Sequence, residues 1–132
     1  RLMLRHMPAN NQRSVALFIG LGHYHNMFTK IQKTNKERWN IINEKINQEP
    51  LLSCTPTHGG STFWIKIPES VDTEKLCMKL LEKGVAVRPG SASFYESNPP
   101  SNYLHLGYSA IDTNKINKGI DIIVKEIKTM IL

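Results

Sequence analysis

Two positions in the second half of the chain carry side chains suited to holding an anionic ligand. His105 lies between Leu104 and Leu106 in a run whose alternation predicts a strand, so its imidazole should leave the face opposite to the two leucines. Arg88 ends a short apolar run, and a guanidinium can hold a carboxylate or phosphate through two parallel hydrogen bonds. Each position also has a plain structural reading: a histidine hydrogen-bonded at a sheet edge, and a solvated arginine at the end of a strand.

The sequence signatures of other site chemistries are missing. No GxSxG nucleophile elbow, Walker phosphate loop or GxGxxG dinucleotide motif occurs, and Cys54 and Cys77 do not form a CxxC pair. His23 and His25 are two residues apart, which does not match the i, i+4 pair of a helical metal site. We therefore predict no metal site and no complete set of catalytic residues within this chain.

Composition narrows the class of protein. The chain has 132 residues, of which 40% are hydrophobic and 21% charged, values typical of one globular domain. Its longest uncharged apolar stretch, residues 14–21, is too short to span a membrane, and its first eight residues lack the apolar region of a secretory signal. We expect a cytoplasmic protein with no membrane partner. Because the chain begins at Arg1, we also expect it to be a piece of a longer protein.

Hydrophobic periodicity indicates the elements that would position Arg88 and His105. Residues 14–22 predict a helix buried on several sides, and a long amphipathic helix should follow and end before Pro50. Beyond Pro50 the pattern predicts a strand in residues 61–68, a helix over 73–83, a short strand over 85–88 turned by a Pro-Gly pair, a loop, a strand in 102–109 and a final helix striped with isoleucine.

These elements predict an α+β fold. We expect a two-layer domain with a small, mainly antiparallel sheet covered by helices, preceded by the long helix. The expected division places the N-terminal helices, including the long connecting helix, in residues 1–50 and the small α+β domain in residues 51–132.

Four segments of the chain carry a resemblance when they are read in order. They are NNQRSVALFIGLGHYHNMFTKIQKTNKERW, THGGSTFWIKIP, EKGVAVRPGSASF and NYLHLGYSAID…INKGIDII. In this order and spacing they resemble the C-terminal part of the fold-type I pyridoxal-phosphate-dependent aminotransferases. The aminotransferase-like portion of the MocR subfamily of GntR regulators is the most similar. The resemblance runs from about Gln12 to Ile127.

The resemblance implies a division of labour in a longer protein. In the family, the long helix connects a large cofactor-binding domain to the small domain, whose sheet forms part of the active-site rim. The full-length protein would bind pyridoxal phosphate through a lysine and phosphate-binding residues upstream of Arg1, and this chain alone would hold no cofactor and be inactive. A homodimer is implied, and DNA would be bound only through an upstream helix-turn-helix domain. The resemblance leaves open whether the whole is a transaminase or an effector-sensing regulator.

One residue departs from the family pattern. The arginine of the family segment N.LRLG.S pairs with the substrate α-carboxylate, whereas this chain has His105 there. Losing a bidentate, charge-assisted contact costs on the order of 2 kcal/mol in binding. Three explanations stay open: the ligand lacks an α-carboxylate, Arg88 substitutes, or the protein has changed from catalysis to sensing. His105 and Arg88 are the predicted substrate- or effector-binding residues at the rim.

The net charge of +6 supports an alternative of another class. A stand-alone basic module would use cations of the long helix to bind a polyanion or nucleic acid. No aromatic residue is interleaved with these charges on the polar face of the helix, which weakens the alternative. The cations are Lys30, Lys33, Lys36, Arg38 and Lys45.

Overall fold

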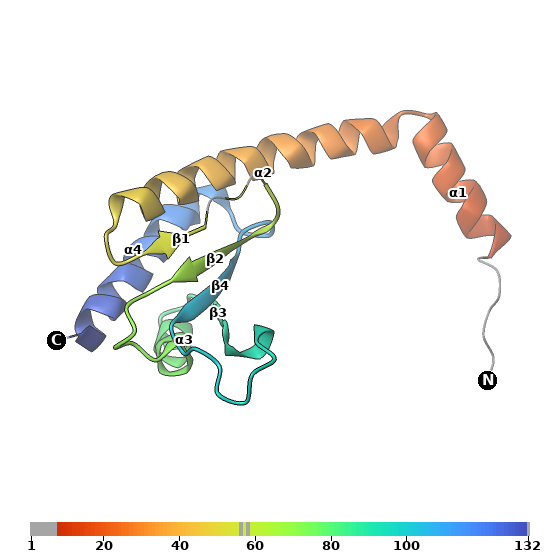
Figure 1. The fold of residues 1–132 in the computed structure, drawn as a ribbon. Helices are drawn as coiled ribbons and strands as arrows, with labels where there is room; N and C mark the ends of the chain where they lie inside the picture. The colour runs from red at the N-terminus through yellow and green to blue at the C-terminus, as the bar shows by residue number, and fades with distance from the viewer. Residues whose placement is uncertain (1–7, 56, 58, 132) are drawn as a thin grey trace. The chain divides into compact units, whose positions relative to one another are not determined.

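The computed structural model describes residues 8–55, 57 and 59–131. The chain forms two compact units, one ending at Thr34 and the other beginning at Asn35. In chain order the elements are α1 (Ala9–Gly20), α2 (His23–Gln48), β1 (Ser53–Cys54), β2 (Thr62–Lys66), α3 (Thr73–Glu82), β3 (Arg88–Pro89), the 3₁₀ turn η1 (Ser91–Ser93), β4 (Tyr103–Gly107) and α4 (Thr113–Ile131) (Figure 1).

The unit that ends at Thr34 contains α1 and the beginning of α2. Gly22, with φ at +76°, makes the turn between the two helices. None of the residues of α1 is buried. The prediction of a helix buried on several sides is therefore wrong for this chain, because no layer among the described residues covers its apolar side chains. The exposed large side chains of this unit are Val15, Leu17, Phe18, Ile19, Leu21, Tyr24, Met27, Phe28 and Ile31.

The unit that begins at Asn35 is built on a four-stranded sheet in the order β1-β2-β4-β3, in which all neighbouring strands are antiparallel. The predicted α+β fold with a small antiparallel sheet is confirmed. In the central strands β2 and β4 the burial alternates, and Phe63, Ile65, Leu104 and Leu106 all point to one face, here called the inner face. Strand β1 was not predicted, because two residues are too few to show alternation.

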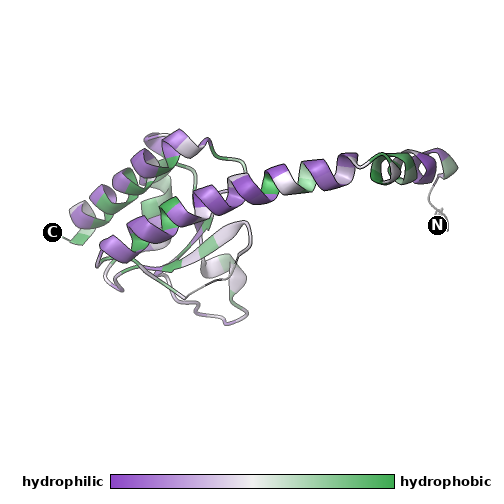
Figure 2. Cartoon of the chain, turned by 90° about the horizontal axis from the view of Figure 1, so that it is seen from above, coloured by the Kyte–Doolittle hydropathy of each residue, from purple (hydrophilic) through white to green (hydrophobic). Residues whose placement is uncertain are grey.

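Helices cover the inner face. The isoleucines of α4 at positions 116, 120, 123 and 127 are buried, as their spacing predicts, and Figure 2 shows this hydrophobic stripe turned toward the rest of the unit. From α2, Ile42 and Ile46 join the same core. Helix α3 adds Leu76 and Leu80, and its first turn is capped by the Asp72 carboxylate, which accepts from the Glu74 and Lys75 amides.

Two local predictions between α3 and β3 are wrong. The apolar pattern of residues 73–83 predicts that Leu81 faces the core together with Leu76, Cys77 and Leu80, but Leu81 is 65% exposed. A strand is predicted over 85–88, whereas the observed strand β3 begins only at Arg88 and includes Pro89. The cause is the end of α3, where Gly84 takes φ +77° and the Val85 amide donates to the Leu80 carbonyl. This helix end uses residues that the pattern assigned to the strand.

An ion pair ties α3 to α4. The Glu126 carboxylate is buried, and Lys83 at the end of α3 binds it. A second pair joins Lys45 of α2 to Asp121 of α4 at 2.8 Å. These contacts fix the helices against which the sheet is held. Among the described residues, no helix has the length and apolarity required to cross a membrane.

Candidate functional site

The face of the sheet opposite to the inner face, here called the outer face, brings the two predicted site residues together. The strand register pairs Trp64 of β2 with His105 of β4, and His105 with Arg88 of β3. Directly paired residues of antiparallel strands project from the same side of a sheet, with Cβ atoms about 4.5–5.5 Å apart. Trp64, His105 and Arg88 therefore form one row across three strands, on the side away from the buried leucines.

An aromatic cluster occupies the outer face beside this row. The Trp64 ring stacks on Tyr103 with centroids 5.5 Å apart and an interplanar angle of 23°. The ring of Phe94, just after η1, has its centroid 5.8 Å from that of Trp64 and 5.5 Å from that of Tyr103. The His105 ring lies 6.1 Å from that of Trp64. These half-buried rings form a continuous apolar wall next to the histidine and the arginine.

Gly90 allows the turn after β3 to lie against the cluster. Its amide donates to the Tyr103 carbonyl at 2.7 Å. A Cβ atom at this position would lie 2.6 Å from the Tyr103 Cβ and 2.8 Å from the Trp64 ring, distances at which atoms overlap. Glycine is therefore needed here for close approach, and it sets the position of β3 and of Arg88 on the outer face.

Arg88 and His105 differ in their surroundings. Arg88 is exposed, and within residues 8–55, 57 and 59–131 its guanidinium makes no hydrogen bond or ion pair. His105 is half-buried and contacts Trp64, without a hydrogen-bond partner in the same ranges. The outer face thus presents an unpaired cationic fork beside a packed imidazole and an aromatic wall.

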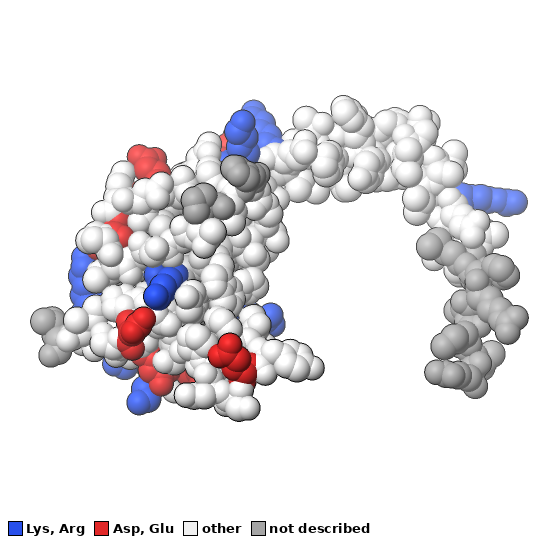
Figure 3. Space-filling view, viewed as in Figure 1, with Lys and Arg blue, Asp and Glu red and all other residues white. Residues whose placement is uncertain are grey.

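Some of the cations of α2 that were considered for binding a polyanion make contacts within the chain. Arg38 donates to the backbone carbonyl of Ser109, and Lys45 is paired with Asp121. On the face shown in Figure 3, basic side chains lie together over α2, and acidic and basic side chains are mixed over the rest of the unit that begins at Asn35. Two of the five cations are thus held by contacts within the chain, whereas Lys30, Lys33 and Lys36 are exposed.

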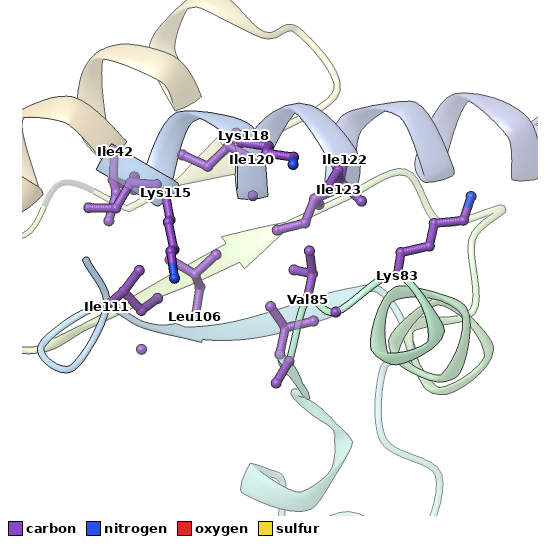
Figure 4. Close-up of a pocket in the computed structure, with 16 residues that line it drawn as sticks. Ile42, Lys83, Val85, Leu106, Ile111, Lys115, Lys118, Ile120, Ile122 and Ile123 are labelled. Atoms are coloured by element: carbon purple, nitrogen blue, oxygen red, sulfur yellow. The ribbon is translucent and has the colours of Figure 1, made fainter. Parts of the chain in front are cut away.

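A pocket of about 470 Å³ lies elsewhere, between α4 and the segment that leads into β3 (Figure 4). Ile111, Ile120, Ile123 and Val85 line it, with lysines at its rim. Leu106 reaches it from the inner face, so the pocket lies on the opposite side of the sheet from Arg88 and His105. Among the residues described, no group of three or more metal-ligating side chains occurs.

The two cysteines are not activated nucleophiles. Burial raises the pKa of the Cys77 thiol to about 11, with a further contribution from the nearby Glu74 carboxylate. Burial also raises the pKa of Cys54. Both cysteines are free thiols. Since the thiolate is the reactive form, neither has the depressed pKa of a catalytic cysteine.

Comparison with known proteins places this geometry in a family. The chain is 33% identical over 127 residues to the HTH-type transcriptional regulator TauR of Rhodobacter capsulatus, a match that covers 96% of this chain and 26% of TauR. The structure of Pyrococcus horikoshii kynurenine aminotransferase superposes with a TM-score of 0.73 at 26% identity, covering 86% of this chain and 28% of that one. The chain is similar in sequence to TauR and has the fold of a segment of the fold-type I aminotransferases.

A further structure supports the fold of this aminotransferase-like chain. LysN, the α-aminoadipate aminotransferase of Thermus thermophilus, superposes with a TM-score of 0.79 at 23% identity, covering 96% of this chain and 32% of LysN. No family model matches the chain. The chain spans about a quarter of the length of TauR and about a third of LysN.

Sequence reasoning missed the aromatic wall and the role of Gly90. The alternation of residues 61–68 does place Trp64 on the face opposite to Phe63 and Ile65, and the structure has it there. It does not reveal that β2 pairs with β4, and this pairing is what brings Tyr103 and Trp64 together. A tryptophan on the non-core face of a strand was the available signal.

Proposed function

We propose that the outer face forms the small-domain side of the substrate or effector site in a pyridoxal-phosphate-dependent, aminotransferase-like protein. The row formed by Trp64, His105 and Arg88 carries this proposal, because it sets a hydrogen-bonding ring and a free guanidinium beside an aromatic wall. A ligand site needs such a combination of apolar surface and a few convergent polar groups. Arg88 and His105 are the ligand-binding residues in this proposal.

The cofactor of the family requires residues beyond this chain. Aminotransferases of this fold use pyridoxal phosphate, which acts as an electron sink for chemistry at an amino group. The described lysines do not fit the role of its Schiff-base residue: eleven are exposed, and the half-buried Lys45 is paired with Asp121. The large domain of the full-length protein holds the cofactor in this proposal, and the present chain contributes the wall opposite.

The apolar surface of the unit ending at Thr34 supports a role in domain assembly. From Ser14 to Thr29 this unit has no Lys, Arg, Asp or Glu, and Figure 3 shows white surface over α1 and the beginning of α2 apart from one basic side chain on α1. Contiguous exposed apolar surface marks an interaction site. In this proposal residues 1–50 are the connecting helices, whose apolar unit ending at Thr34 packs on the large domain, and residues 51–132 are the small C-terminal domain of a cytoplasmic homodimer.

The proposal covers both an enzyme and a regulator. TauR is an HTH-type transcriptional regulator, and the kynurenine aminotransferase is an enzyme. A winged helix-turn-helix segment encoded upstream of Arg1 would make the protein a regulator of the MocR type that binds DNA through that segment. A large domain with a Schiff-base lysine and no such segment would make it a transaminase.

Side-chain oxidation of the full-length protein tests the proposed site. Hydroxyl-radical footprinting with mass spectrometry would compare the protein stripped of pyridoxal phosphate with the loaded protein. Trp64 and Phe94 should be oxidised more slowly in the loaded protein, because the cofactor and the closed domain cover the outer face. Met78, which is 62% exposed on α3, is the matched control and should not change. Equal oxidation of the aromatic side chains in both states contradicts the proposal.

A further inference from the structure

Arg88 projects from the outer face next to the position where the family has its arginine. The register sets Arg88 on β3 directly opposite His105 on β4. The Cβ atoms of such a pair lie about 4.5–5.5 Å apart, and an arginine side chain has three methylene groups before its guanidinium. The guanidinium is therefore long enough to extend over His105, whose imidazole is shorter than an arginine side chain.

The charges near Arg88 leave its guanidinium available. Lys66, on the same face, is paired with Glu69 at 3.5 Å. Glu74 of α3 accepts a hydrogen bond from the Ser91 hydroxyl at 3.2 Å. In the described part of the chain no carboxylate binds Arg88. An exposed arginine without an intramolecular partner, held on a short strand beside aromatic rings, is free to take a ligand anion through its two-pronged fork.

His105 is less suited to the same task. Its ring lies against Trp64, and an imidazole presents at most one N–H in any one direction. It cannot form the two parallel hydrogen bonds that a carboxylate accepts from a guanidinium. Its packing in the cluster instead extends the apolar wall formed by Trp64, Tyr103 and Phe94.

We propose that anion binding in this protein has moved across one strand, so that Arg88 holds the carboxylate of the ligand while His105 packs against its carbon skeleton. This inference rests on the proposed function of the outer face. It names the ligand class as a carboxylic acid with an apolar or aromatic body, because the free guanidinium lies on the same face as the Trp64 and Tyr103 rings.

The test uses the full-length protein loaded with pyridoxal phosphate and a matched pair of small molecules. 3-Phenylpropanoate has a carboxylate and a ring and lacks an amino group, so it does not react with the cofactor, and 3-phenylpropanamide is its neutral counterpart. Isothermal titration calorimetry gives both affinities. The wild type should prefer the acid, and Arg88→Gln should lower affinity for the acid by about tenfold or more while leaving the amide unchanged.

Three further variants separate charge from packing. Arg88→Lys keeps the charge without the fork and should recover part of the preference for the acid. His105→Gln should weaken acid and amide about equally, since it removes packing. Arg88→Gln combined with His105→Arg should restore the preference for the acid. Far-UV circular dichroism of each variant checks that the fold is kept.

A pH series gives an independent readout. A guanidinium keeps its charge at all pH values at which proteins fold, so the preference of the wild type for the acid should stay constant from about pH 6 to pH 9. A preference that disappears toward pH 9 would identify an imidazolium as the binding group and overturn the inference.

The remaining outcomes distinguish this inference from the proposed function. If His105→Gln abolishes the preference for the acid and Arg88→Gln does not, the carboxylate is held by His105, the inference is wrong and the outer face remains the ligand site. Equal affinity of the wild type for acid and amide also overturns the inference. If the wild type prefers the acid and no variant changes that preference, the ligand does not bind at the outer face, and the proposed function fails with the inference.

Discussion

The two faces of one sheet have different roles in this molecule. On the inner face Leu104 and Leu106 are packed by helices, whereas on the outer face Tyr103 and His105 of the same strand are only half-buried. The difference comes from the two-residue period of a strand, which sends neighbouring side chains to opposite sides. A single strand therefore contributes one set of residues to the core and leaves the other set accessible on the opposite face.

The largest expected effect comes from the inner face. Leu104 is fully buried in the central strand, so Leu104→Ala removes apolar contacts and leaves a cavity. The free energy of unfolding should fall by about 2–5 kcal/mol. Urea unfolding followed by far-UV circular dichroism measures it. A loss below about 1 kcal/mol would mean that the core relaxes around the cavity, contrary to the close packing described here.

Gly90→Ala should have the next largest effect on the free energy of unfolding, and it should also change the outer face. The added Cβ would overlap the Tyr103 Cβ and the Trp64 ring, so β3 must shift. Overpacking of this kind costs about 1–3 kcal/mol in the free energy of unfolding. Ligand affinity should fall as well, because Arg88 moves with β3. Gly119→Ala is the control, since a Cβ at position 119 meets no atom within 4 Å. Equal stability of the two variants would contradict the close approach at Gly90.

His105→Ala, next to Leu104 in sequence, should change stability by about 1 kcal/mol or less, since the half-buried ring loses one aromatic contact. The same urea unfolding measures it. A loss as large as that of Leu104→Ala would show that the outer face also carries the fold, and would remove the contrast between the two faces.

The free energy of unfolding should depend on pH through the thiol of Cys77 in α3. Its thiol pKa is raised by burial to about 11 in the folded chain, compared with 9.0 for an ordinary thiol. Between these two values the unfolded chain loses the thiol proton more readily than the folded one. The stability linked to Cys77 is therefore fully present below pH 9 and is lost as the pH rises toward 11.

Alkylation of a Cys54→Ser variant by iodoacetamide measures this pKa directly. The rate at Cys77 should rise with a midpoint near pH 11 in the folded chain and near pH 9 in urea. A folded midpoint at or below 9 would show that α3 does not shield the thiol from solvent.

Local signals made much of the fold predictable. The isoleucine stripe of α4, the Asp72 cap, the Gly84 stop and the alternation in β2 and β4 are each set by residues close together in sequence. Burial of α1 could not be predicted correctly, since its exposed apolar side chains have no cover among the described residues. Strand β3 was misplaced because the end of α3 continues to Val85.

The sequence indicated the residues of the candidate site but not how the strands bring them together. Alternation shows which face His105 takes, but the pairing of Arg88 with His105 joins strands that are far apart in sequence. The aromatic wall depends on the same long-range pairing and on the close approach at Gly90. Residue types indicated an anion site, and only the register showed that the arginine and the histidine share one face.

A crystal structure of the full-length protein with pyridoxal phosphate bound tests the central claim most directly. The account predicts that Trp64, His105 and Arg88 lie on the wall that faces the cofactor across the ligand cleft. An outer face that is turned to solvent, or filled by side chains of another domain, would contradict it.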